Sequence, residues 1–190
     1  KLIENGHKVA ICEQLEDPKL AKGIVKRDVI RVVTPGTVTE SNLLEEKRNN
    51  YIMSIFKKGT FFGIAVCDIS TGDFYATEIK EDNNFQRLLD EISRYSPSEI
   101  IANNMLYDCE EEINKIKERF DVYISTEDEE KFSESTKEIS EQYSLLTDTG
   151  KNIDKIDDKL FTICAINGLI AYINDTQKTK LEHLNKIIIY

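Results

Sequence analysis

One aspartate stands where an enzyme could hold a metal ion. Asp68 lies at the end of a nearly continuous apolar run, FFGIAVCDI at 61–69, and Asp90 and Glu91 follow in a segment with helical periodicity. Carboxylates at a strand end and on a helix can bind two metal ions that cleave a phosphodiester. Asp68 also precedes Ser70-Thr71-Gly72, which are common turn residues. We favour the turn, and metal-dependent cleavage through Asp68 is the alternative.

A second candidate site is basic. The segment KLAKGIVKRD supplies Lys19, Lys22, Lys26 and Arg27 on both sides of a glycine. Such side chains bind the phosphates of a nucleic-acid backbone, but they are also common in solvated loops that lead into a strand. The residues alone leave both interpretations open. Our candidates for contacts with a DNA backbone are Lys22, Lys26 and Arg27.

The sequence lacks the patterns of a nucleotide site and of a zinc site. Gly150-Lys151 would need a glycine at position 145 and a Ser or Thr at 152 to form a phosphate loop, and the chain has Leu and Asn there. The only histidines, His7 and His183, lie at opposite ends without ligand spacing to a cysteine. We expect no bound metal, no ATP and no other cofactor in this segment.

The four cysteines are widely spaced, and three of them, Cys12, Cys67 and Cys164, lie in apolar runs. We expect reduced thiols in a protein core, as in a cytosolic protein. No run approaches the roughly 20 apolar residues of a membrane span, and the chain begins without a signal region or an initiator Met. We therefore expect a fragment of a longer protein, with no membrane contact.

Charge is distributed unevenly along the 190 residues, whose formal net charge is -10. Residues 1–48 carry nine basic and eight acidic residues, so they are close to neutral, and 49–190 carry 16 basic and 27 acidic residues. Binding to duplex DNA requires clustered Lys and Arg that displace counterions. The acidic remainder is a poor candidate for gripping nucleic acid by itself.

The element pattern predicts a mixed α/β sheet. A helix end and a strand at 1–12 precede a second strand at 25–33, which Pro35-Gly36 closes, and 38–49 is typical of a linker. Strands at 51–56, 61–69 and 73–79, separated by short glycine-containing turns, predict an antiparallel meander. Helical periodicity at 85–92 and 113–120 alternates with short strands at 100–102 and 122–124, which predicts parallel crossovers with helices on both faces.

The last third is less regular. The acidic stretch 126–141 contains two apolar residues, so we expect a solvated helix or loop. The dense apolar run 160–173 predicts a long, deeply packed helix, whose packing partner is open. We expect residues 174–190 to leave the domain and to end in a strand.

Four stretches in combination resemble the bacterial MutS DNA mismatch-repair ATPases. They are VAICEQLEDP at 9–18, KGIVKRDVIRVVTPGT at 22–37, CDISTGDF at 67–74 and YINDTQKTKLEHL at 172–184. The resemblance implies that 1–37 is the end of a mismatch-recognition domain, 38–49 a linker and 50–153 a connector domain. That connector would have a ribonuclease-H-like fold without nuclease activity. Residues 154–190 would be a helix and the exit into the core and lever region.

The resemblance also implies a division of labour. The family's intercalating Phe-x-Glu motif should precede Lys1, and its ATPase motifs should follow Tyr190. The segment would then be a non-catalytic structural and interaction module. The parent protein would bind mispaired double-stranded DNA with ATP and Mg²⁺, form a homodimer and recruit MutL, in the bacterial cytoplasm at the nucleoid. The basic segment would belong to the DNA-facing domain, which explains its place beside an acidic remainder.

Overall fold

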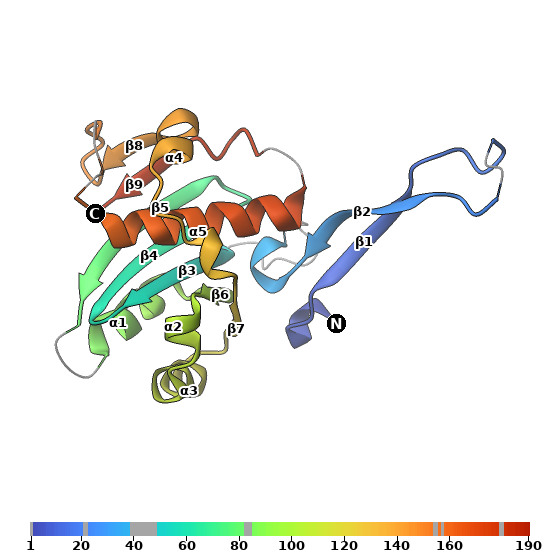
Figure 1. Cartoon of the computed structure of the whole chain (residues 1–190). Coiled ribbons are helices and arrows are strands. Elements are labelled where there is room, and N and C mark those ends of the chain that lie inside the picture. The colour runs from blue at the N-terminus through green and yellow to red at the C-terminus, as the bar shows by residue number, and fades with distance from the viewer. Residues whose placement is uncertain are drawn as a thin grey trace.

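The computed structural model describes residues 2–20, 23–38, 49–81, 85–153, 156, 158–178 and 181–190, apart from the side chains of Glu4 and Glu138. These residues form a two-stranded hairpin and a seven-stranded mixed sheet with helices on both faces. Figure 1 shows the hairpin projecting from the body that the large sheet forms. The predicted mixed α/β class is confirmed.

The hairpin, here called the arm, is built from β1 (Val9–Gln14) and β2 (Arg27–Val33) in antiparallel pairing. The 3₁₀ turn η1 (Ile3–Asn5) precedes it and ends at Gly6, whose positive φ of 77° suits glycine. The turn η2 (Pro35–Thr37) closes β2, as the Pro-Gly pair predicts. A β-bulge interrupts the register next to Ile11 and Cys12. The predicted linker at 38–49 lies largely outside the described residues.

The large sheet has the order β7-β6-β3-β4-β5-β9-β8. The strands are Tyr123–Thr126, Glu99–Ala102, Tyr51–Lys58, Phe61–Asp68, Asp73–Lys80, Lys186–Ile189 and Ser144–Thr147. β4 pairs antiparallel with both β3 and β5, and the other pairs in this sheet are parallel. The predicted meander and the two parallel crossovers are therefore confirmed.

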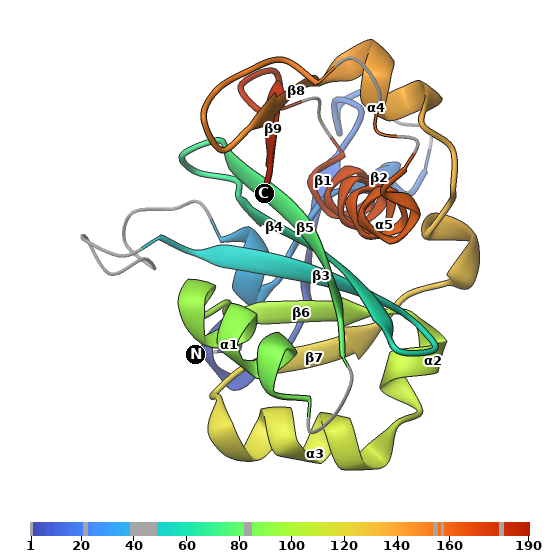
Figure 2. The ribbon, with the colours of Figure 1, turned by 90° about the vertical axis from the view of Figure 1, so that its left-hand side faces the viewer.

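Helices cover the two faces unequally. The helices α1 (Gln86–Tyr95), α2 (Asn104–Tyr107) and α3 (Glu110–Arg119) pack on one face, and the 18-residue helix α5 (Leu160–Gln177) packs on the other. Figure 2 shows α5 nearly end-on, across the sheet from α1 and α3. The 3₁₀ turn η3 (Glu129–Lys131) and α4 (Lys137–Gln142) lie on the α5 side, where Phe132 and Ile139 join its core.

Alternation along the central strands explains both cores. In β3, Ile52 and Phe56 face α5 while Met53 and Ile55 face the other helices. In β4, the positions that face α5 include Gly63 and Ala65, and a Cβ atom at Gly63 would lie only 1.7 Å from the Phe161 carbonyl oxygen. The small residue therefore lets the helix backbone rest directly on the strand.

The long apolar helix is confirmed, and its partner is the sheet of this same chain. Residues Ile163, Ile166 and Ile170 of α5 are buried in one cluster with residues from β3, β4 and β5. The nearly continuous apolar character of 160–173 has a physical cause, since α4 and the 126–135 segment cover the helix from outside. Gly168 contacts the Phe132 ring, which leaves no space for a Cβ atom there.

Two expectations about the last third are wrong. Residues 174–190 do not leave the domain, because β9 inserts between β5 and β8 in the sheet. The stretch 126–141 is not simply solvated, because Phe132 and Ile139 are buried against α5. Both structural features depend on contacts with residues distant in sequence.

Among the described helices, none combines the length and apolar character that crossing a membrane demands.

Candidate functional site

Two of the three basic candidates, Lys26 and Arg27, lie near the distal end of the arm. Lys26 and Arg27 are exposed at the start of β2, and Lys22 lies outside the described residues. The Lys26 backbone is held, since its N–H donates to Glu16 Oε1 at 2.7 Å and its carbonyl accepts from Leu15 N–H at 2.9 Å. Neither the Lys26 nor the Arg27 side chain forms an ion pair with another described residue. Both charges are available to a phosphate.

Acidic residues on the arm limit what these charges can do. The register places Glu13 opposite Asp28 and Gln14 opposite Arg27. Segment 9–37 carries five basic and four acidic side chains. A surface of this kind offers a few phosphate contacts within a weak overall field, and phosphate contacts carry no sequence information. Any DNA binding by the arm alone should therefore be weak and independent of base sequence.

The arm also exposes apolar side chains. Ile24 is 100% exposed, Leu20 is 80% exposed and Leu15 is 52% exposed. The sequence predicts a core thiol at Cys12, and this is wrong: Cys12 is exposed, on a strand β1 that is exposed along nearly its whole length. A two-stranded ribbon has no second layer of its own to cover its faces. Cys67 and Cys164, in the body, are buried as predicted.

Asp68 serves a turn. Its side chain is 1% exposed, and both carboxylate oxygens accept hydrogen bonds. Oδ2 accepts from Asn50 N–H at 3.0 Å, while Oδ1 accepts from the Ser70 N–H at 2.8 Å and the Ser70 hydroxyl at 2.6 Å. The Gly72 N–H closes the β4–β5 turn on the Asp68 carbonyl oxygen at 2.9 Å. The Asp68 carboxylate therefore holds the β4–β5 turn through Ser70 and binds the backbone at Asn50.

The proposed carboxylate partners of Asp68 point elsewhere. Asp90 is exposed on α1 and accepts a hydrogen bond from Gln86 Nε2 at 2.6 Å. Glu91 accepts from the Tyr190 hydroxyl at 2.7 Å and lies 3.8 Å from Arg94. Within the part of the chain that the structure describes, no three His, Cys, Asp or Glu side chains converge as metal ligands would. The geometry offers no support for cleavage through Asp68.

Gly150-Lys151 does not form a phosphate cradle. The Gly150 N–H donates to the Thr147 carbonyl oxygen at 2.8 Å, and the Lys151 N–H donates to Thr147 Oγ1 at 3.0 Å. These amides are consumed inside a tight turn after β8, and no helix starts at Lys151 to present further N–H groups. The Gly-Lys pair therefore belongs to a turn and does not present the N–H groups of a phosphate loop.

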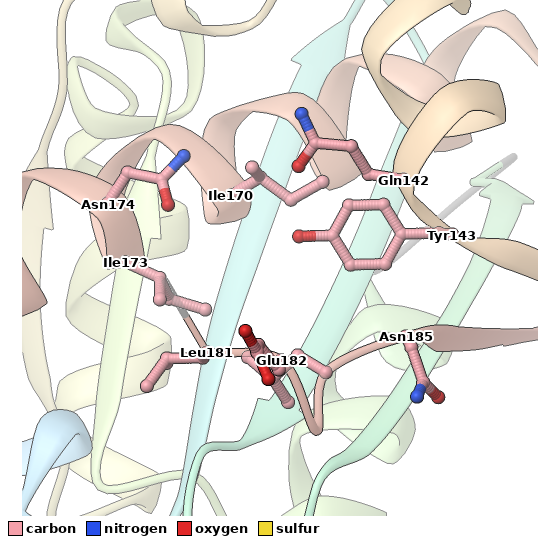
Figure 3. A pocket seen from close by; sticks show the side chains of 9 residues that line it. Gln142, Tyr143, Ile170, Ile173, Asn174, Leu181, Glu182 and Asn185 are labelled. Carbon is pink, nitrogen blue, oxygen red and sulfur yellow. The ribbon is translucent and has the colours of Figure 1, made fainter. Parts of the chain in front are cut away.

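The body has a small hollow between α4, α5 and the loop before β9 (Figure 3). Its volume is about 140 Å³, below the roughly 300–1,000 Å³ typical of small-molecule sites. Its apolar floor is ringed by amide, phenol and carboxylate groups. The lining residues are Gln142, Tyr143, Ile170, Ile173, Asn174, Leu181, Glu182, Leu184 and Asn185.

Sequence reasoning missed the polar cluster where the arm joins the body. Thr34 and Gly36, at the base of the arm, bind the carboxylate of Glu99 on β6, and Tyr172 of α5 binds it from the other side. Glu99 reads in the sequence as a polar residue before the strand at 100–102. The only sequence signal was its position next to a buried strand, which is too common to identify a site.

The fold and the arm together define a mixed α/β domain that carries a projecting two-stranded arm. A family model described as MutS domain II matches residues 50–185, and one described as MutS domain I matches residues 1–42. The chain belongs to the MutS family.

Curated relatives agree over the full chain. Proteins named DNA mismatch repair protein MutS are 48% identical in Ruminiclostridium cellulolyticum, 47% in Acetivibrio thermocellus and 40% in Caldanaerobacter subterraneus subsp. tengcongensis. Each match covers 100% of this chain and 21% of the relative. The chain thus spans about a fifth of the length of these relatives, and the resemblance stated from the sequence motifs is confirmed.

Proposed function

We propose that this chain is a non-catalytic connector module of a MutS-type mismatch-repair protein, with its arm reaching toward the DNA backbone. The single observation that carries the proposal is the pairing of two unlike parts in one chain. The exposed arm bears Lys26 and Arg27, which form no ion pair with another described residue. In the acidic body, no three described His, Cys, Asp or Glu side chains converge as metal ligands would. The arm supplies weak phosphate contacts, and the body holds them at a fixed place.

The sheet order supports a ribonuclease-H-like connector. The meander β3-β4-β5 is followed by β6 and β7, which add in parallel beside β3 through helical crossovers. This is the arrangement that the resemblance implies. In this proposal the recognition-domain part covers 1–37, the linker 38–49, and the connector starts at 50. It continues beyond 153, because α5 and β9 complete its core and sheet.

The remaining activities belong to the whole protein in this proposal. The parent protein would recognise mispaired duplex DNA, hydrolyse ATP with Mg²⁺, form a homodimer and recruit MutL in the bacterial cytoplasm at the nucleoid. Family membership supports this assignment. The chain's own residues would contribute positioning and backbone contacts, while mismatch specificity and ATP hydrolysis would come from other segments.

Fluorescence anisotropy with matched and mismatched duplexes tests the role of the arm. The chain should bind both duplexes with equal affinity. If about three phosphates are contacted, affinity should fall about 40-fold between 50 and 200 mM salt. Replacing Lys26 and Arg27 with alanine should reduce the slope of log affinity against log salt by about 2.

The double variant Lys117→Ala, Arg119→Ala is the matched control, because it removes the same charge from exposed positions on α3. It should leave the salt slope nearly unchanged. Equal losses in both double variants would mean that net charge, and not the arm, governs binding. Strong preference for the mismatched duplex would contradict the assigned role.

A further inference from the structure

The base of the arm contacts a buried carboxylate of the body. Glu99 is fully buried at the start of β6, on the face of the sheet that α5 covers. Its Oε2 atom accepts hydrogen bonds from Thr34 Oγ1 at 2.5 Å and from Gly36 N–H at 2.9 Å. Its Oε1 atom accepts from the Tyr172 hydroxyl at 2.6 Å. One side chain therefore joins the arm, the sheet and helix α5.

The threonines of the turn orient the donors. Thr34 gives its only hydroxyl proton to Glu99, so in the 2.9 Å contact between the two hydroxyls Thr37 must be the donor. Thr37 Oγ1 in turn accepts from the Thr34 N–H at 2.9 Å. The turn closes on itself and presents both the Thr34 hydroxyl and the Gly36 N–H to the same oxygen.

A second contact holds the turn from the other side. Asn50 Nδ2 donates to the Pro35 carbonyl oxygen at 3.0 Å, and Asn50 Oδ1 accepts from the Ser98 hydroxyl at 2.6 Å. Space is equally restricted, because a Cβ atom at Gly36 would lie 2.8 Å from Ile52 Cβ and 2.9 Å from Glu99 Cβ. The turn is seated directly on the sheet.

The tyrosine is a suitable donor from α5. Burial, followed by the charge of Glu99, raises the pKa of Tyr172 above its usual range, so the hydroxyl keeps its proton. Lys8 Nζ, from the arm, lies 4.8 Å from the centroid of the Tyr172 ring. Tyr172 therefore contacts the arm through its ring and the Glu99 carboxylate through its hydroxyl.

We propose that Glu99 is a positioning residue that holds the arm in one orientation relative to the sheet and α5. Moving the arm away would strip the carboxylate of the Thr34 and Gly36 donors in a water-excluded place, which is strongly unfavourable. The contacts of Glu99 with Thr34, Gly36 and Tyr172 are here called the clamp. The clamp thus fixes the position of Lys26 and Arg27, the proposed phosphate contacts of the arm, relative to the body. Its relevance to DNA rests on the proposed function, but the clamp itself does not.

Distances between two spin labels measure the orientation directly. Cys12 labels the arm, and Glu118→Cys labels exposed α3 in a Cys109→Ser background, while Cys67 and Cys164 are buried. The parent chain should give one narrow distance distribution. Glu99→Leu removes all three acceptor contacts and should give loss of that single distance. A folded Glu99→Leu chain that keeps the narrow distribution would overturn the proposal.

Glu81→Leu is the matched control, because Glu81 is a buried glutamate whose carboxylate accepts the Leu88 N–H at 2.9 Å, away from the arm. It should leave the distribution narrow; broadening equal to that of Glu99→Leu would overturn the assignment to Glu99. Because Glu99→Leu could fail to fold, Thr34→Val is compared with Thr34→Ser. The valine should broaden the distribution and the serine, which keeps the donor, should not; identical distributions would overturn the proposal.

The same chains measured by anisotropy separate this inference from the proposed function. A clamp that acts on DNA binding predicts weaker duplex affinity in Glu99→Leu than in Glu81→Leu. If the parent chain fails to bind duplex DNA, the proposed function fails while the distance result still decides the clamp. If DNA binds but the distances stay narrow in Glu99→Leu, only the clamp fails.

Discussion

The arm and the body contain similar strand-forming amino acids, but the arm exposes them and the body buries them. Both contain strands rich in Ile and Val, yet the arm leaves Ile24 and Leu20 exposed while β4 is buried along nearly its whole length. Of the nine large hydrophobic side chains exposed in the described residues, six lie at positions 2–29. Strand-forming sequence alone does not create a core. A second layer does, and the body obtains it from α5 on one face and from three helices on the other.

Polar groups reverse the contrast. The described charged side chains of β1 and β2 are exposed except for the partly buried Arg31, whereas the body buries Asp68 and Glu99 and surrounds each with donors. Buried carboxylates are tolerated only where hydrogen bonds replace water. In the body, buried carboxylates therefore hold backbone segments in place: Asp68 holds the β4–β5 turn, and Glu99 holds the base of the arm. Pairs of similar substitutions, one in each region, test this difference.

Truncating an isoleucine should separate the regions most strongly. Ile166→Ala removes a fully buried side chain of α5 and should cost about 2–5 kcal/mol of unfolding free energy. Ile11→Ala, on the exposed strand β1, should change it by no more than about 0.5 kcal/mol. Urea denaturation followed by circular dichroism measures both. Equal costs would mean that the arm is packed as densely as the core.

Thiol reactivity should show the next largest contrast. Burial raises the pKa of Cys164 to about 11, so at pH 8 its thiolate fraction is about 100-fold lower than that of a thiol with pKa 9. Because a raised pKa means less thiolate, alkylation of Cys164 in the folded chain should be slow and should accelerate as pH rises toward 11. Exposed Cys12 should react first. Peptide-resolved mass spectrometry with iodoacetamide measures each rate, and comparable rates at pH 8 would contradict the assigned burial.

Neutralising an aspartate should have the smallest of these effects. Asp68→Asn replaces one acceptor oxygen with a donor inside the β4–β5 turn and should cost about 1–3 kcal/mol. Asp28→Asn is the arm counterpart, where an exposed carboxylate accepts the Val29 N–H, and its cost should be much smaller. Thermal unfolding compares the stability of the two variants.

A nuclease assay with Mg²⁺ or Mn²⁺ should detect no cleavage by the parent chain or by Asp68→Asn. Cleavage by the parent chain that Asp68→Asn abolishes would restore the catalytic alternative.

The sequence predicts those elements that can be identified from the apolar pattern of a few neighbouring residues. The run at 61–69 is apolar on both faces, and it became the central strand β4 for that reason. The run at 160–173 likewise became α5. The 3₁₀ end at Gly6 and the closure at Pro35 followed from local backbone chemistry. In each case the information is contained within a few neighbouring residues.

What the sequence could not provide was the identity of distant partners. Ile187–Ile189 reads as a strand, but nothing local indicates that it would pair with both β5 and β8. Phe132 reads as an isolated apolar residue in an acidic stretch until Gly168 supplies the space for its ring. Glu99 is a candidate only once Thr34 and Tyr172 are brought to it by the fold.

The position of β9 has a consequence for how the protein forms during synthesis. β8 is attached to the sheet through β9, and β9 is the last strand of this sheet to be made. A growing chain that has emerged as far as α5 can assemble the five strands from β5 to β7, but β8 must wait for 186–189 before it acquires a neighbour. Residues 186–189 thus complete this sheet, and a ribosome that stalls shortly before them would leave the edge of β5 open to pairing with other chains.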